Sequence, residues 1–124
     1  MSKTILMIGS ALMALAVGLG AFGAHGLKSQ LSETMLQTYK TGVDYHFYHA
    51  LGLLIIGVLV VTIPSTLLKW SAVCLTAGII LFSGSLYVLS ISGIKWLGAI
   101  TPFGGLSFIA GWVLLFVAVW KSFS

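Results

Sequence analysis

The chain has no arginine and only two acidic residues, Glu33 and Asp44, among its 124 positions. Charged residues make up 6% of the sequence and hydrophobic residues 59%, whereas roughly a quarter of the residues in a soluble domain are charged. Nucleic-acid recognition relies heavily on arginine, and the lysines here lie singly, not in a basic stripe. We therefore expect a protein that contacts the lipid bilayer and no nucleic acid.

Cysteine and proline are also scarce. Cys74 is the only cysteine, so an internal disulfide is excluded and the sequence indicates no redox compartment. The two prolines, Pro64 and Pro102, both lie at the boundaries of long apolar runs. Pro64 closes one run, and Thr101 before Pro102 predicts an N-cap followed by proline at the first helical position.

Long apolar runs are what the sequence has in abundance. They cover residues 4–24, 45–63, 70–91 and 102–120, and each has roughly the 20 residues that a helix needs to cross about 30 Å of hydrocarbon. The first run also resembles a signal peptide, but it is longer than the usual apolar region of about 7 to 15 residues. We predict an all-α fold, an integral membrane four-helix bundle in a single four-span domain over residues 1–124.

A different pattern lies between the first two runs. Leu31, Met35 and Tyr39 recur every four residues, Glu33 comes early, and Gly42 follows as a stop signal. This predicts a short interfacial amphipathic helix between spans 1 and 2. An ordinary ordered connector is the alternative.

Four alternating spans place both termini on the same side of the membrane. The lysines do not orient the chain by the positive-inside rule, because three fall on each side. One side holds Lys3, Lys69 and Lys121, and the opposite side holds Lys28, Lys40 and Lys95. The N-terminal amine adds positive charge to the side of the termini, and both acids lie on the opposite side. We therefore expect the termini to be cytoplasmic and the membrane to be the cell membrane, inner or plasma.

The ionisable groups gather around one crossing, between the first two spans. Ionisable groups at a bilayer edge are costly and often mark a site. At 100° per residue, Tyr45 and His49 share one face of the second span, while His46 points away from Asp44. We predict that His25 from the first span joins Tyr45 and His49.

The later spans also carry polar and small residues toward this side. Ser83 and Tyr87 follow helical spacing, and their hydroxyls require another helix or water as partner. Gly104 has no side chain to cover the backbone N–H groups at the start of the fourth span. This suits either the binding of an anion or close helix packing. The full predicted polar cluster is His25, Asp44, Tyr45, His49, Ser83, Tyr87, Thr101 and Gly104.

Two interpretations of this cluster remain open. Neutral imidazoles at His25 and His49 could ligate a metal or haem iron, or relay a proton. The same rings could instead anchor helices and donate interhelical hydrogen bonds. The sequence shows no third clear ligand beside the H-x-x-H pattern, so we expect no metal, no haem or other cofactor, and no catalytic residue.

The glycines of the first span spell G-x-G-x-x-G at Gly18, Gly20 and Gly23. A nucleotide site would need a preceding strand, whereas these glycines end an apolar helix. Helix packing explains them better, since Ser10, Ala14 and Gly18 repeat at a spacing that lets backbones approach closely.

Several motifs together resemble a known family. They are GAFGAHGL at 20–27, YHFYHALG at 45–52, FSGSLY at 82–87 and TPFGG at 101–105 with Gly111 and Trp112. The chain resembles, over essentially its whole length, the small bacterial inner-membrane family known as domain of unknown function 423, which is similar to eukaryotic transmembrane protein 256. The resemblance implies a four-span membrane protein and carries no established activity or cofactor.

We therefore expect a multi-pass membrane protein that is not an enzyme. It would act as an accessory or interaction protein, as a homo-oligomer or within a larger membrane complex. The alternative is a site for a small molecule, a lipid or quinone, or a proton, opening on the membrane face that carries His25, His49 and Thr101.

Overall fold

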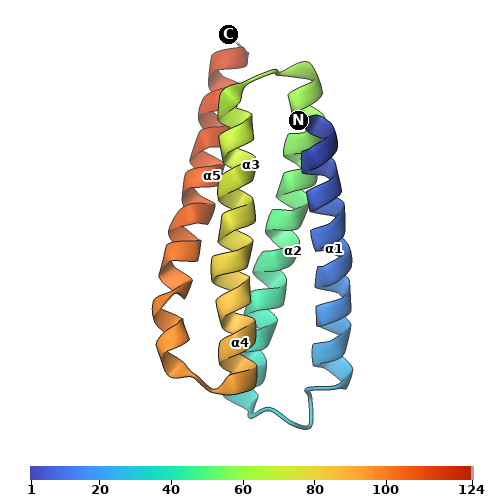
Figure 1. The fold of residues 1–124 in the computed structure, drawn as a ribbon, viewed down its shortest axis with the longest axis vertical. Coiled ribbons are helices and arrows are strands. Elements are labelled where there is room, and N and C mark those ends of the chain that lie inside the picture. Colours follow the sequence, from blue (N-terminus) through green and yellow to red (C-terminus); the bar gives the residue numbers. More distant parts are fainter. Residues whose placement is uncertain (124) are drawn as a thin grey trace.

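The computed structural model describes residues 1–123 as helices joined by short connections (Figure 1). The elements are α1 (Ser2–His25), α2 (Glu33–Thr62), α3 (Thr66–Gly78), the π-helix η1 (Ile79–Ser83), α4 (Gly84–Ser92), the 3-10 helix η2 (Lys95–Ala99) and α5 (Thr101–Ser122). Since α3, η1 and α4 follow one another without a break, and η2 leads into α5, the described chain has four helices long and apolar enough to cross a membrane. The predicted all-α four-helix architecture is confirmed.

The helix predicted between the first two spans is present, but it is the beginning of α2, not a separate helix. Ser32 caps it, because its hydroxyl oxygen accepts the backbone N–H of Met35 at 3.2 Å. Gly42 does not stop the helix. A Cβ at that position would lie 3.1 Å from the Tyr87 ring, so this glycine permits close packing, and the buried Tyr39 continues the face that packs inside the bundle. The segment therefore lies along the bundle and not on the membrane surface.

The helices pack as two pairs. α1 packs on α2, and α3 packs on α5, while α2 also contacts α3, η1 and α4. In Figure 1 the order across the view is α5, α3, α2 and α1. The shared core includes the fully buried side chains of Leu53, Ile56, Leu68 and Leu75. Both termini lie at one end of this bundle (Figure 1), as four alternating spans require.

Small residues bring α3 and α5 together. A Cβ on Gly111 would lie 3.2 Å from the Ser71 carbonyl oxygen, so the two backbones approach closely there. The Ser71 hydroxyl donates to the Gly111 carbonyl at 2.6 Å, and the Ser107 hydroxyl donates to the Cys74 carbonyl at 2.7 Å. Helix packing thus accounts for the small residues of α5.

The π-helix η1 was not predicted. The backbone N–H of Gly84 bonds to the Ile79 carbonyl, five residues earlier, and single wide turns of this kind often occur at functional positions. This turn carries Phe82 and Ser83, which contact α5 and α2 respectively. It therefore lies where the second and fourth spans meet the third.

Candidate functional site

The residues of the predicted polar cluster lie between the middle of the bundle and the end where α1 finishes and α5 begins. They do not form one site. The structure divides them into an inner hydrogen-bonded group on α2, η1 and α4, an aromatic group on α2, η1 and α5, the two residues at the start of α5, and residues on the outside of the bundle. Each of these has a different chemical environment.

The inner group is centred on His46, which the sequence analysis had set aside. Its side chain is 1% exposed, and its Nδ1 atom lies 2.8 Å from the Tyr87 hydroxyl. One turn away, the Ser83 hydroxyl donates to the Gly42 carbonyl at 2.7 Å. The polar stripe predicted on the third span therefore finds its partners on α2.

Tyr39 closes this group on the α1 side. Its ring centroid lies 5.2 Å from that of Tyr87, and its hydroxyl donates to the Leu19 carbonyl at 2.5 Å. Tyr39 and His46 are seven residues apart, with Gly42 and Val43 between them on the same buried face of α2. That helical spacing was the signal that could have identified His46 from the sequence.

The aromatic group is centred on His49. Its Nδ1 lies 2.6 Å from the Tyr45 carbonyl oxygen. A carbonyl only accepts, so Nδ1 carries the proton and, in the neutral ring, Nε2 presents a lone pair. The imidazole stacks on Phe108 of α5 with centroids 3.5 Å apart and an interplanar angle of 7°. Tyr45 and His49 lie together, as expected from their helical spacing, but the ring stacked on His49 comes from α5 and not from His25.

A groove of about 690 Å³ opens beside these rings. Within residues 1–123, the only buried side-chain nitrogen or oxygen without a hydrogen-bond partner is Nε2 of His46. The hydrogen bond of the His49 ring is made by Nδ1, and Nε2 is its other nitrogen. The groove is aromatic, and the His49 ring in its lining is 5% exposed. Its lining residues are Tyr45, His49, Phe82, Pro102, Gly105, Leu106, Phe108, Ile109 and Trp112.

The start of α5 differs from its prediction. Thr101 does not cap the helix, since Ile100 occupies the N-cap position without a side-chain hydrogen bond. The Thr101 hydroxyl instead lies 2.6 Å from the Ser85 hydroxyl of α4. Gly104 packs directly against the backbone of Phe82, and its N–H donates to the Ile100 carbonyl at 3.4 Å, so this N–H is not free to bind an anion.

His25 and Asp44 lie on the outside of the bundle, so the structure does not bring them to His49. The reason is the arrangement of the helices around α2. α1 packs along the side of α2 that carries Val43, which faces Gly20, whereas α5 reaches the side that carries Gly52, which faces Trp112. Among the described residues, no group of three or more histidine, cysteine, aspartate or glutamate side chains could hold a metal ion.

Comparison with known proteins gives consistent matches over nearly the whole chain. The chain is 47% identical over 123 residues to the UPF0382 membrane protein YwdK of Bacillus subtilis, covering 96% of this chain and 98% of that protein. It is 45% identical over 119 residues to a UPF0382 membrane protein of Staphylococcus haemolyticus, covering 96% and 97%. No solved structure matches.

The family described as protein of unknown function (DUF423) matches residues 19–105. This range includes α2, α3, η1 and α4 completely and extends into the first turn of α5. It therefore contains both the inner hydrogen-bonded group and the His49 side of the aromatic groove. With the match to this family and the high identity to its membrane-protein relatives, the chain belongs to the DUF423 family of membrane proteins.

Proposed function

We propose that this membrane protein is a non-catalytic accessory protein that acts by binding other transmembrane helices. Its polar side chains support a non-catalytic role, because most of them form hydrogen bonds within the bundle. The hydroxyls of Ser71, Ser83 and Ser107 each donate to a backbone carbonyl of a neighbouring span. Groups used in this way hold helices together and are not placed as a nucleophile beside a base.

The observation that carries the proposal is the small-residue stripe of α1. Ser10, Ala14 and Gly18 are exposed, and a Cβ on Gly18 would meet no atom within 4 Å. In the most apolar 18-residue stretch of α1, only 17% is buried in the bundle, compared with 44% for the corresponding stretch of α2. Small residues at four-residue spacing let a second helix approach closely, so the stripe suits a second copy of this chain or a helix of another membrane protein.

The test replaces Gly18 with isoleucine in the tagged full chain and compares it with Val17→Ile, an adjacent exposed position outside the stripe. Both proteins are purified in mild detergent, and the mass of the protein component is measured by light scattering. We expect the wild type and Val17→Ile to form a complex that Gly18→Ile disrupts. A monomeric wild type would exclude a second copy of this chain as the partner, and a complex that survives Gly18→Ile would exclude the stripe as its interface.

We further propose that the protein resides in the cell membrane with both termini in the cytoplasm. The N-terminal amine adds a positive charge to that side, and both acids, Glu33 and Asp44, lie toward the opposite end of the bundle. Positive charge is retained preferentially on the cytoplasmic side. This orientation places the end with the aromatic groove toward the outside.

A second candidate function is supported by the groove beside His49. A neutral imidazole within aromatic walls suits a planar ring that carries a hydroxyl, such as a quinol, because the ring can stack while its hydroxyl donates to Nε2 of His49. Trp112 lines the groove and lies 5.7 Å from His49, measured between ring centroids. Its fluorescence would therefore report binding.

A short-chain quinol is the probe for this candidate. We expect it to quench the fluorescence of the wild type saturably, and replacing His49 with leucine to weaken its affinity about fivefold, as loss of about 1 kcal/mol from one hydrogen bond implies. The Trp112→Phe variant should lose most of the saturable signal. Quenching that is linear in quinol concentration, or equal in the His49→Leu variant, would exclude this ligand.

A further inference from the structure

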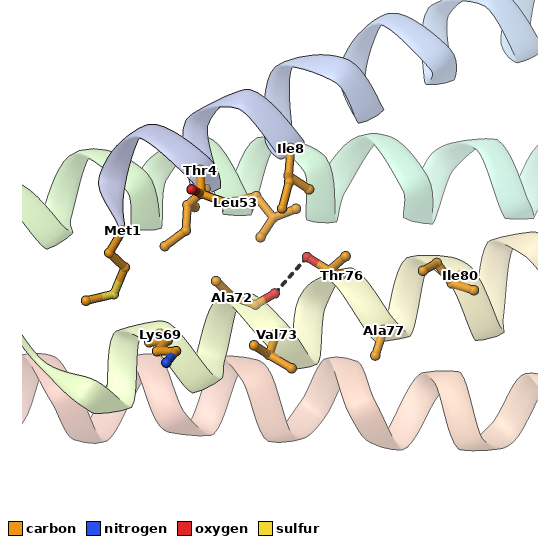
Figure 2. A pocket seen from close by; sticks show the side chains of 11 residues that line it. Met1, Thr4, Ile8, Leu53, Lys69, Ala72, Val73, Thr76, Ala77 and Ile80 are labelled. Carbon is orange, nitrogen blue, oxygen red and sulfur yellow. Dashed lines mark hydrogen bonds between the residues drawn. The ribbon is translucent and has the colours of Figure 1, made fainter.

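A second cleft lies at the other end of the bundle, between α1 and α3, with Leu53 of α2 behind it (Figure 2). Its volume is about 650 Å³. Ile8 of α1 and Thr76 of α3 face each other across it, and Lys69 lies near the end that also holds Met1 (Figure 2). The cleft exists because α1 packs on α2 and makes little contact with α3.

The length of the cleft corresponds to one leaflet of a bilayer. Its wall on α3 and η1 extends from Lys69 to Ile80, and eleven residues of helix rise about 16 Å. Half of a hydrocarbon core about 30 Å thick is about 15 Å. Trp70, beside Lys69, is 51% exposed, as expected for an aromatic residue at the membrane interface. The cleft therefore begins near the headgroups and ends near the bilayer centre.

The chemistry of the walls changes with depth. Lys69 is the only charged side chain in the lining, and its Nζ lies 5.8 Å from the Trp70 ring centroid. Deeper in the cleft, the Thr76 hydroxyl donates to the Ala72 carbonyl at 2.8 Å, so it is already paired. What remains below Lys69 is almost wholly hydrocarbon, with no acidic side chain to repel an anion.

We propose that this cleft binds one acyl chain of an anionic glycerophospholipid, with the lipid phosphate beside the Lys69 ammonium. The acyl chain would fill the space between Ile8 and Thr76, which α1 and α3 leave open. Charge complementarity selects an anionic headgroup over a zwitterionic one, and the single-leaflet depth selects a membrane lipid over a water-soluble phosphate. The site is independent of the α1 stripe and of the groove beside His49.

The headgroup is tested by native mass spectrometry of the full chain in detergent, with phosphatidylglycerol and phosphatidylcholine of identical acyl chains supplied in equal amounts. We expect the wild type to retain phosphatidylglycerol preferentially and Lys69→Gln to reduce that preference about fivefold. Lys121→Gln is the matched control, because it removes one exposed positive charge at the same end of the bundle. It should keep the preference.

The acyl-chain site is tested by filling the cleft from either wall. Thr76→Phe and, separately, Ile8→Phe should lower retention of both lipids, whereas Val113→Phe, at an exposed position on α5 outside both this cleft and the groove beside His49, should not. Two filling variants are used so that a folding defect in one, seen by circular dichroism, leaves the other to decide. If Lys69→Gln matches Lys121→Gln, or if a folded filling variant retains lipid like the wild type, the lipids are only annular and the proposal is wrong.

Discussion

The hydroxyl of Tyr87 lies 2.8 Å from Nδ1 of His46, and this one hydrogen bond joins α4 to α2 inside the bundle. Both side chains come from positions near the polar end, yet His46 is buried as deeply as the core residues around it. A buried imidazole requires such a partner, because an unpaired polar group in an apolar interior is costly. The pair is therefore part of what holds the second and third spans in register.

Replacing Tyr87 with phenylalanine removes the hydroxyl and leaves Nδ1 of His46 without this partner. We expect the free energy of unfolding to fall by about 1 kcal/mol, a value typical of one hydrogen bond and within the range seen between membrane helices. The measurement is loss of helical circular dichroism as sodium dodecyl sulfate is added to mixed micelles. Tyr48→Phe, at an exposed position, is the control, and equal effects of the two changes would contradict the role of the bond.

Gly104 and Gly105 form a matched pair for testing helix approach. A Cβ at Gly104 would lie 2.7 Å from the Phe82 Cα, whereas a Cβ at Gly105 would lie 4.0 Å from its nearest neighbour. Both Gly→Ala changes gain the same helix propensity, so that gain cancels in the comparison. We expect Gly104→Ala to be less stable than Gly105→Ala by about 1–3 kcal/mol, the usual cost of overpacking. Equal unfolding midpoints would show that η1 moves aside freely.

Ser83 provides a second test of the contact between η1 and α2. Its hydroxyl donates to the Gly42 carbonyl of a different helix, whereas the Ser92 hydroxyl bonds to Val88 within its own helix on an exposed surface. We expect Ser83→Ala to reduce the free energy of unfolding by about 0.6 kcal/mol or more. Ser92→Ala loses only local bonds to Val88 and Ile94 at an exposed helix end, so it should reduce this free energy less. The same detergent titration measures both variants. If Ser92→Ala lowered the free energy of unfolding more than Ser83→Ala, the buried Ser83 hydroxyl would have no stabilising role.

The membrane topology is tested with single cysteines in a Cys74→Ser background. His25→Cys and Trp96→Cys lie on exposed residues at one end of the bundle, and Lys121→Cys lies at the other. In intact cells, a membrane-impermeant maleimide should label the first two together, and Lys121→Cys only after the membrane is permeabilised. Labelling of His25→Cys and Trp96→Cys from opposite sides would contradict the four-span arrangement, while the reverse accessibility of all three would overturn only the cytoplasmic termini.

The long apolar runs by themselves determined the four spans and their alternation. Backbone groups in hydrocarbon must bond within their own helix, so composition and length alone lead to this result. Helical spacing also placed Tyr45 and His49 on a common face, and it placed Ser83 and Tyr87 on a stripe that required a partner. These predictions depend on the geometry of one helix at a time.

Tertiary packing alone decided which helix lies against each of those faces. Gly42 looked like a helix stop in the sequence, but it lies within α2. Its lack of a side chain leaves room for the Tyr87 ring to pack there. His25 was expected beside His49, yet Phe108 of α5 takes that place, since α1 packs on another side of α2. Neighbouring positions on one helix can face different partners, and only the contacts among all four helices select between them.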